Sequence, residues 1–167
     1  NAAVSLGVSL KEVSTDAGVD ILSFGGTKNG LMMGEAVCFL RPGLSGDFKY
    51  IRKQGMHLAS KMRFISAQYI AYFRGDLWKR CATHSNRMAR LLAEGLKQTE
   101  GVRIVQKVQS NGVFVMIPSA VAERIREKYF FYSWDESKSE YRLMTSWDTT
   151  EEDIEGFIEE LRKEIRR

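Results

Sequence analysis

The strongest candidate for a chemically reactive residue in this sequence is a single lysine in a glycine-rich turn. Residues 23–34 read Ser-Phe-Gly-Gly-Thr-Lys-Asn-Gly-Leu-Met-Met-Gly, and Lys28 lies between two apolar runs, 19–24 and 35–40. These runs predict two short strands. We expect a lysine fixed between strands to have a partly desolvated amine, which burial makes nucleophilic towards an aldehyde. The setting suits a Schiff base with pyridoxal phosphate.

Local chemistry alone leaves other interpretations of this turn open. Most lysines beside glycines are solvated loop residues, and the hydroxyls of Ser23 and Thr27 could cap the turn or contact a phosphate. Two other glycine motifs are excluded. The dinucleotide pattern G-x-G-x-x-G is absent, and a P-loop needs Gly-Lys-Ser/Thr, where this chain has Thr27-Lys28-Asn29.

Composition places the chain among ordinary globular proteins. It has 167 residues, 44% of them hydrophobic and 28% charged, and no apolar run approaches the roughly 20 residues of a membrane span. The two cysteines, Cys38 and Cys81, are predicted to be reduced, buried thiols of a cytoplasmic protein. The net charge is +4, with many cations in residues 49–90. Their spread favours solvated helix faces over a nucleic-acid surface.

Hydrophobic periodicity indicates which elements position the lysine turn. Before and after the predicted strands, it favours helices over 1–17, over 47–74 with a bend near Gly55, and over 77–99. The remainder predicts the order β-β-α-β-β-α, which suggests an antiparallel sheet covered by helices on one face. Its predicted strands and helices are 102–108, 113–117, 118–128, 130–134, 140–146 and a last helix from 151.

Few other residues stand out as candidates for chemistry. Arg142 lies in a predicted strand, where its guanidinium could bind a carboxylate with two parallel hydrogen bonds. Local reasoning favours an ordinary surface arginine. His57 and His84 are 27 residues apart without a second metal ligand at helical spacing, so no metal site is predicted. No Ser-His-Asp or Cys-His arrangement is supported.

Four stretches together resemble one enzyme family. They are residues 23–37 around the lysine, Arg52-Lys53-Gln54, Ser60 to Gln68, and Tyr141 to Thr150. The chain is similar to the threonine aldolases, which belong to the beta-eliminating lyases and to the fold-type I pyridoxal phosphate enzymes. The likeness runs in order over nearly the whole chain.

The resemblance implies a fold and a set of site residues. Residues 1–75 would form the C-terminal part of the α/β, cofactor-binding large domain with its connecting helix. Residues 76–167 would form a small α+β domain with an antiparallel sheet. Lys28 would be the catalytic lysine that binds pyridoxal phosphate, and Arg142 would bind the substrate carboxylate. Arg63 would contact the cofactor phosphate or the partner subunit, although the residues just before it depart from the glycine-rich pattern of one family branch. The hydroxyls of Ser23 and Thr27, which are close to the lysine in the sequence, could contact the cofactor phosphate.

The resemblance also implies an activity and an assembly. The protein would cleave a β-hydroxy-α-amino acid, threonine or allo-threonine, to glycine and an aldehyde, and would form a homodimer or homotetramer. The family's upstream Asp-Gly-Ala-Arg segment is absent, so we expect the sequence to be the C-terminal part of a longer enzyme. Another fold-type I lyase, an aminotransferase and a non-catalytic helical interaction module remain alternatives.

Overall fold

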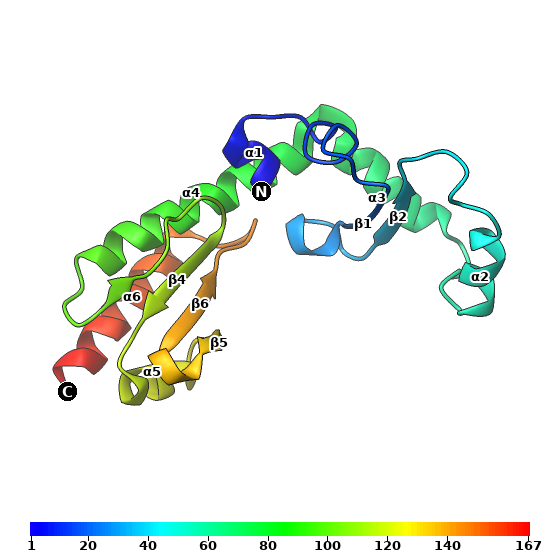
Figure 1. The fold of residues 1–167 in the computed structure, drawn as a ribbon. Helices are drawn as coiled ribbons and strands as arrows, with labels where there is room; N and C mark the ends of the chain where they lie inside the picture. Colours follow the sequence, from blue (N-terminus) through cyan, green and yellow to red (C-terminus); the bar gives the residue numbers. More distant parts are fainter. The chain divides into compact units, whose positions relative to one another are not determined.

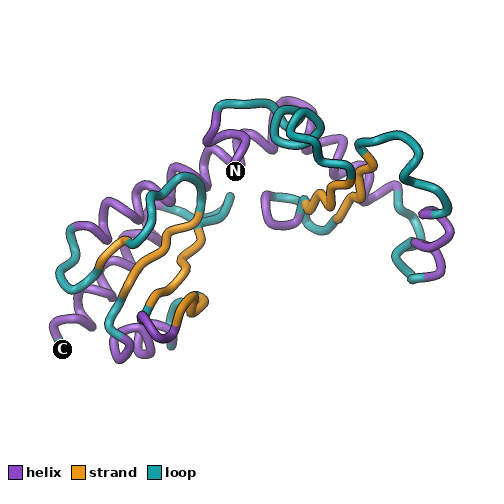
Figure 2. Tube along the Cα trace, viewed as in Figure 1, coloured by secondary structure: helices purple, strands orange, loops and turns teal.

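A computed structural model describes residues 1–167 and shows two compact units (Figure 1). One unit comprises residues 6–81, and the other comprises residues 1–5 together with 82–167. Each unit has its own β-sheet, of two and four strands respectively (Figure 2). None of the helices combines the length and the apolar character that a membrane span requires.

The C-terminal unit is built on a four-stranded antiparallel sheet. Its strands are β3 (Arg103–Ile104), β4 (Gly112–Met116), β5 (Tyr132–Asp135) and β6 (Glu140–Met144), in the spatial order β3-β4-β6-β5. Three helices, α4 (Leu77–Lys97), α5 (Ser119–Arg126) and α6 (Glu151–Arg166), pack their apolar residues against one face of this sheet (Figure 1). The structure therefore has the antiparallel sheet and the one-sided helical cover that the sequence predicts.

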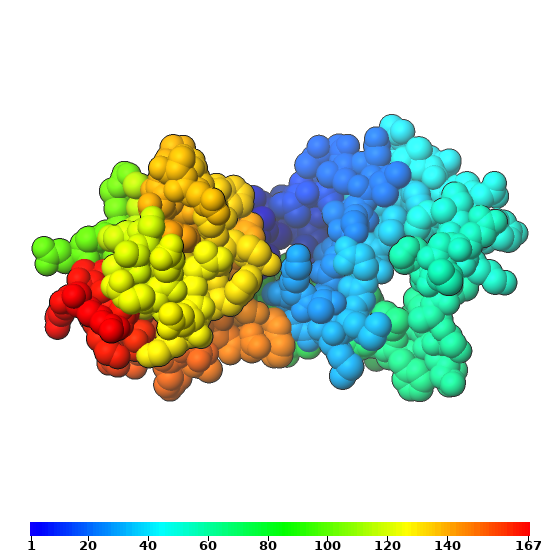
Figure 3. Space-filling view, turned by 90° about the horizontal axis from the view of Figure 1, so that it is seen from below, coloured from blue at the N-terminus to red at the C-terminus, as the bar shows by residue number.

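Helix α6 shows how the sequence specifies this packing. Thr150 caps its first turn, because the threonine hydroxyl accepts from the Asp153 N–H and the Asp153 carboxylate accepts from the Thr150 N–H. Its apolar residues Ile154, Phe157, Ile158 and Leu161 are buried, and Leu161 is fully inaccessible to solvent. Helix α6 also contacts α5, whose yellow surface meets the red end of the chain in Figure 3.

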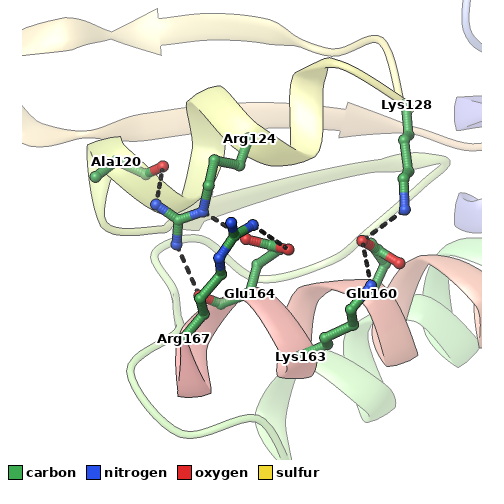
Figure 4. A network of polar contacts seen from close by, with 7 residues as sticks. All are labelled: Ala120, Arg124, Lys128, Glu160, Lys163, Glu164 and Arg167. Atoms are coloured by element: carbon green, nitrogen blue, oxygen red, sulfur yellow. Dashed lines mark hydrogen bonds and ion pairs between the residues drawn. The ribbon is translucent and has the colours of Figure 1, made fainter.

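A network of ion pairs connects α5 and the turn that follows it to α6 (Figure 4). Arg124 donates to the Glu164 carboxylate and, at 2.8 Å, to the Glu164 carbonyl oxygen. Lys128 donates to Glu160 at 2.7 Å. The hydrogen bond from Arg124 lowers the pKa of Glu164 below the ordinary 4.5, and the one from Lys128 lowers that of Glu160 in the same way.

These shifted carboxyl groups predict a loss of stability in acid. A carboxyl group whose pKa is lowered by folding stabilises the folded state above its unfolded pKa, and that contribution disappears as the pH falls through the folded value. We expect Glu164→Gln to reduce the dependence of the unfolding temperature on pH below about 4.5. The exposed Glu159, one turn away without an ion pair, supplies the control Glu159→Gln. Identical pH profiles for the two variants would contradict this role.

The N-terminal unit holds the predicted strand pair. Strands β1 (Ile21–Gly25) and β2 (Glu35–Phe39) pair antiparallel, with Ser23 opposite Val37. Two helices follow, α2 (Phe48–Gln54) and α3 (Arg63–Phe73). Aromatic rings join α3 to the sheet, since Phe24 of β1 lies 6.3 Å from Tyr69 and 5.7 Å from Phe73, measured between ring centroids.

Two helices predicted in the first half of the chain are shorter than expected. Instead of residues 1–17, only α1 (Ala2–Leu6) is helical, because Gly7 adopts a positive φ of 70° and ends it. Ser9 and Glu12 do form the reciprocal bonds of a capping box, but turns follow instead of a helix. The predicted helix 47–74 is two helices separated by residues 55–62.

Two smaller expectations also need correction. The predicted strand 102–108 reduces to two residues, because only Arg103 and Ile104 pair with β4. The cysteines are half-buried instead of buried, and neither forms a disulfide. Burial raises the pKa of the Cys81 thiol, which favours its unreactive protonated form.

Candidate active site

Lys28 lies in the middle of a short 3₁₀ turn, Thr27–Asn29, that connects β1 to β2. The Gly26 N–H donates to the Gly34 carbonyl at 3.0 Å and closes the loop at its base. Gly30 ends the turn with a φ of 109°, a conformation that a residue with a side chain rarely adopts. The strand-flanked glycine turn that the sequence predicts is therefore present.

Hydrogen bonds to two helices fix this turn. The Asn29 amide donates to the Tyr72 hydroxyl of α3 and, at 3.1 Å, to the Trp78 carbonyl of α4. The Gln68 side-chain carbonyl of α3 accepts from the Met32 N–H at 3.0 Å. Burial raises the pKa of the Tyr72 phenol, which keeps it protonated. The backbone on which Lys28 stands is thus held from outside the turn.

Close packing inside the turn explains one of its glycines. A Cβ atom on Gly26 would lie 2.0 Å from Cδ1 of Leu31, a side chain that is buried in the unit. Any side chain at position 26 would therefore displace Leu31 and open the turn. Tyr69 completes the packing, because its hydroxyl donates to the Phe24 carbonyl at 3.0 Å. Its pKa is raised by burial and further by the charge of Glu35.

The Lys28 side chain itself is exposed, which differs from the partly desolvated amine that the sequence suggested. The two strands fix the backbone of the turn, but neither they nor the helices cover the amine. Thr27 accepts from the Gly34 N–H at 3.1 Å, so its hydroxyl hydrogen remains free to donate. Ser23 donates to the Glu35 carboxylate at 2.5 Å. A neighbouring carboxylate makes Ser23 the weaker candidate for binding a phosphate.

A groove of about 960 Å³ begins beside the lysine turn. It extends from Thr27 past β2 to α2 and to Met62, the residue before Arg63. Arg63 is the first residue of α3, is exposed, and has no acidic partner; its guanidinium lies over the Phe64 ring, 4.9 Å from the centroid. Arg52 also lines the groove, and its buried Nε has no hydrogen-bond partner.

Arg142 belongs to the C-terminal unit, on the face of the sheet that the helices leave open. It occupies the middle of β6, opposite Phe114 of β4 and Tyr132 of β5. Its guanidinium carbon lies 5.6 Å from the ring centroid of Tyr132 and 5.2 Å from that of Trp134. It forms no ion pair, and its Nε is buried without a hydrogen-bond partner.

Sequence reasoning missed the residues that hold these candidates in place. Asn29, Gln68 and Tyr72 support the lysine turn, while Tyr132 and Trp134 flank Arg142. For the aromatic pair a signal was present, since aromatic residues at positions 130, 132 and 134 follow the period of a strand. The three turn-supporting residues offered none, because their contacts cross more than 30 positions of the sequence.

Comparisons with known proteins agree with the resemblance in the sequence. The chain is 44% identical over 99% of its length to the low specificity L-threonine aldolase of Pseudomonas aeruginosa, and 40% identical to that of a second Pseudomonas strain. It spans about half the length of these curated relatives, 47% in both cases.

A solved structure confirms the expected fold class, the tail of a fold-type I large domain followed by an α+β domain. The structure of Leishmania major threonine aldolase superimposes with a TM-score of 0.81 at 26% identity, over 96% of this chain and 48% of that one. Residues 1–120 match the family model for beta-eliminating lyases. With a lysine turn, an unpaired strand arginine and these relatives, the chain belongs to the beta-eliminating lyase family.

Proposed function

We propose that this chain supplies the lysine and the carboxylate-binding arginine of a pyridoxal phosphate-dependent lyase. The reaction would be the cleavage of a β-hydroxy-α-amino acid, threonine or allo-threonine, to glycine and an aldehyde. The observation that carries this proposal is Lys28, which stands on a turn fixed by two helices within a chain 44% identical to a low specificity L-threonine aldolase.

The residues around the turn fit the cofactor in chemical type. Its aldehyde needs a primary amine on a rigid backbone, and Lys28 provides one. Its phosphate needs hydroxyl donors and cations without acidic partners, and Thr27 and Arg63 meet that requirement. Ser23 remains a predicted contact, although its hydroxyl is bonded to Glu35.

Each proposed role uses a property that the structure gives the residue. Lys28 would hold the cofactor through its ε-amine, and the anchored turn would limit where that amine can reach. When bound, pyridoxal phosphate supplies an electron sink for the electron pair of the broken Cα–Cβ bond. Arg142 would bind the α-carboxylate with its guanidinium and so orient that bond. By resemblance to the threonine aldolases, the active form would be homo-oligomeric, and groups beyond this turn would exclude water from the exposed Lys28 amine.

Aldehyde release by the intact protein tests this function. We expect the purified holoprotein to be yellow. With L-threonine or L-allo-threonine as the substrate, it should release one glycine for each acetaldehyde. Stoichiometry separates the alternatives. An aminotransferase would require an oxo acid and would release no acetaldehyde, and an interaction module would be colourless. Either of these outcomes would refute the proposal.

A further inference from the structure

The open face of the C-terminal sheet carries an unusual group of side chains. Residues of β4, β5 and β6 that alternate with the core positions point to this face, and Phe114, Arg142 and Tyr132 lie side by side across the three strands. Tyr132 and Trp134 are 56% and 53% exposed, while Arg142 is half-buried. The two aromatic rings therefore cover part of the Arg142 side chain while they remain exposed to solvent themselves.

Arg142 contacts aromatic rings and has no acidic partner. Two ring faces lie within 6 Å of its guanidinium, the range in which a cation is attracted to an aromatic ring. No carboxylate lies within ion-pair distance, even though Glu140 is buried two positions earlier on the same face. The guanidinium is thus held by contacts that leave its hydrogen-bond donors unused.

A β-bulge sets the position of Trp134. Ser133 pairs with Tyr141, but the next pair is Asp135 with Glu140, so Trp134 is the additional residue in β5. Bulges redirect side chains and often occur beside functional sites. The Trp134 ring packs edge-on against Phe114, with 5.0 Å between centroids. It therefore has a support of its own, independent of the arginine.

The connection after the bulge is also fixed. Asp135 accepts from Lys138 at 2.7 Å and from Ser137 at 2.6 Å, and these bonds lower its pKa to about 2. The carboxylate therefore stays ionised and bonded throughout the physiological pH range. This holds the end of β5 in place and keeps Trp134 beside Arg142.

We propose that Trp134 and Tyr132 are positioning residues that hold the Arg142 guanidinium in the orientation needed to bind a substrate carboxylate. This inference rests on the proposed role of Arg142. A flexible arginine loses side-chain entropy when it binds an anion, and two ring contacts remove part of that cost beforehand. The rings also exclude water from one side of the cation while leaving donors for a planar, bidentate partner.

Binding of glycine, the amino acid product, to the intact holoprotein tests the proposal. Isothermal titration calorimetry would compare glycine with glycinamide, which has the same amine but no carboxylate. We expect Trp134→Leu to weaken glycine binding roughly threefold to thirtyfold, the range of equilibrium constants that cation–π interactions span. Glycinamide binding should stay unchanged, and KM should rise more than kcat falls. The conservative Trp134→Phe, which keeps a ring, should restore most of the affinity.

Trp147 provides the matched control. It is an indole of similar exposure, 42%, with no ring contact to Arg142, so Trp147→Leu should leave glycine affinity unchanged. Equal losses for glycine and glycinamide, or equal defects in Trp134→Leu and Trp134→Phe, would overturn the positioning role. If Arg142→Ala weakens glycine binding and Trp134→Leu does not, the inference fails while the proposed function stands. If Arg142→Ala has no effect on glycine binding, the proposed role of Arg142 fails as well.

Discussion

Replacement of Lys28 by alanine is expected to abolish aldehyde release, with a loss of roughly a thousandfold or more in kcat. The variant removes the only amine that lies in the strand-flanked turn, while the turn itself keeps its anchors at Asn29 and Leu31. The holoprotein should also lose its covalently bound cofactor and its yellow colour. Kinetics with L-threonine and absorbance spectra of the purified variant measure both effects.

Peptide mapping after borohydride reduction assigns the lysine directly. The label should appear on the peptide that contains Lys28, because reduction fixes the cofactor to the amine that holds it. Lys53→Ala is the matched control, since Lys53 is an exposed lysine of the same unit on α2. It should retain full activity and colour. A label on Lys49, Lys53 or Lys61 would contradict the assignment of Lys28.

Local sequence patterns predicted the elements whose signals are complete within a few residues. The last helix, predicted from residue 151, and the glycine turn around Lys28 each depend on residues that are close in the chain. The prediction of a helix over 1–17 was wrong because it relied on hydrophobic periodicity and gave too little weight to Gly7. The positive φ of Gly7 ends α1 after five residues. In residues 55–62, Met56 and Lys61 have positive φ values, which cannot be predicted from these residue types.

The sequence predicted which residues belong to the candidate site, but it did not predict their exposure or the side chains around them. The position of Lys28 in a glycine turn follows from the sequence, but its exposure depends on what surrounds the turn. Arg142 was expected in a strand, and it is in one. Its two flanking rings come from a neighbouring strand and a bulge, and strand register is decided by pairings that no local pattern contains.

Replacement of Arg142 by alanine is expected to raise KM for L-threonine about a hundredfold while the cofactor stays bound. Arg142 has no structural ion pair to lose, so its removal should affect ligand binding more than folding. A hundredfold change corresponds to about 2.8 kcal/mol, which lies in the range of about 1.5–3 kcal/mol for hydrogen bonds to charged groups. Steady-state kinetics and the yellow colour of the variant report the two properties separately.

The matched control for this prediction is Arg126→Ala. Arg126 is an exposed arginine of the same unit whose guanidinium also lies over a ring, 5.9 Å from the centroid of Phe131. Its removal should leave KM unchanged, which excludes a general effect of deleting a ring-bound cation. Arg142→Lys should recover only part of the affinity, because an ammonium group cannot form the two parallel hydrogen bonds of a guanidinium. An unchanged KM in Arg142→Ala would rule out the carboxylate-binding role, and a colourless variant would assign Arg142 to holding the cofactor instead.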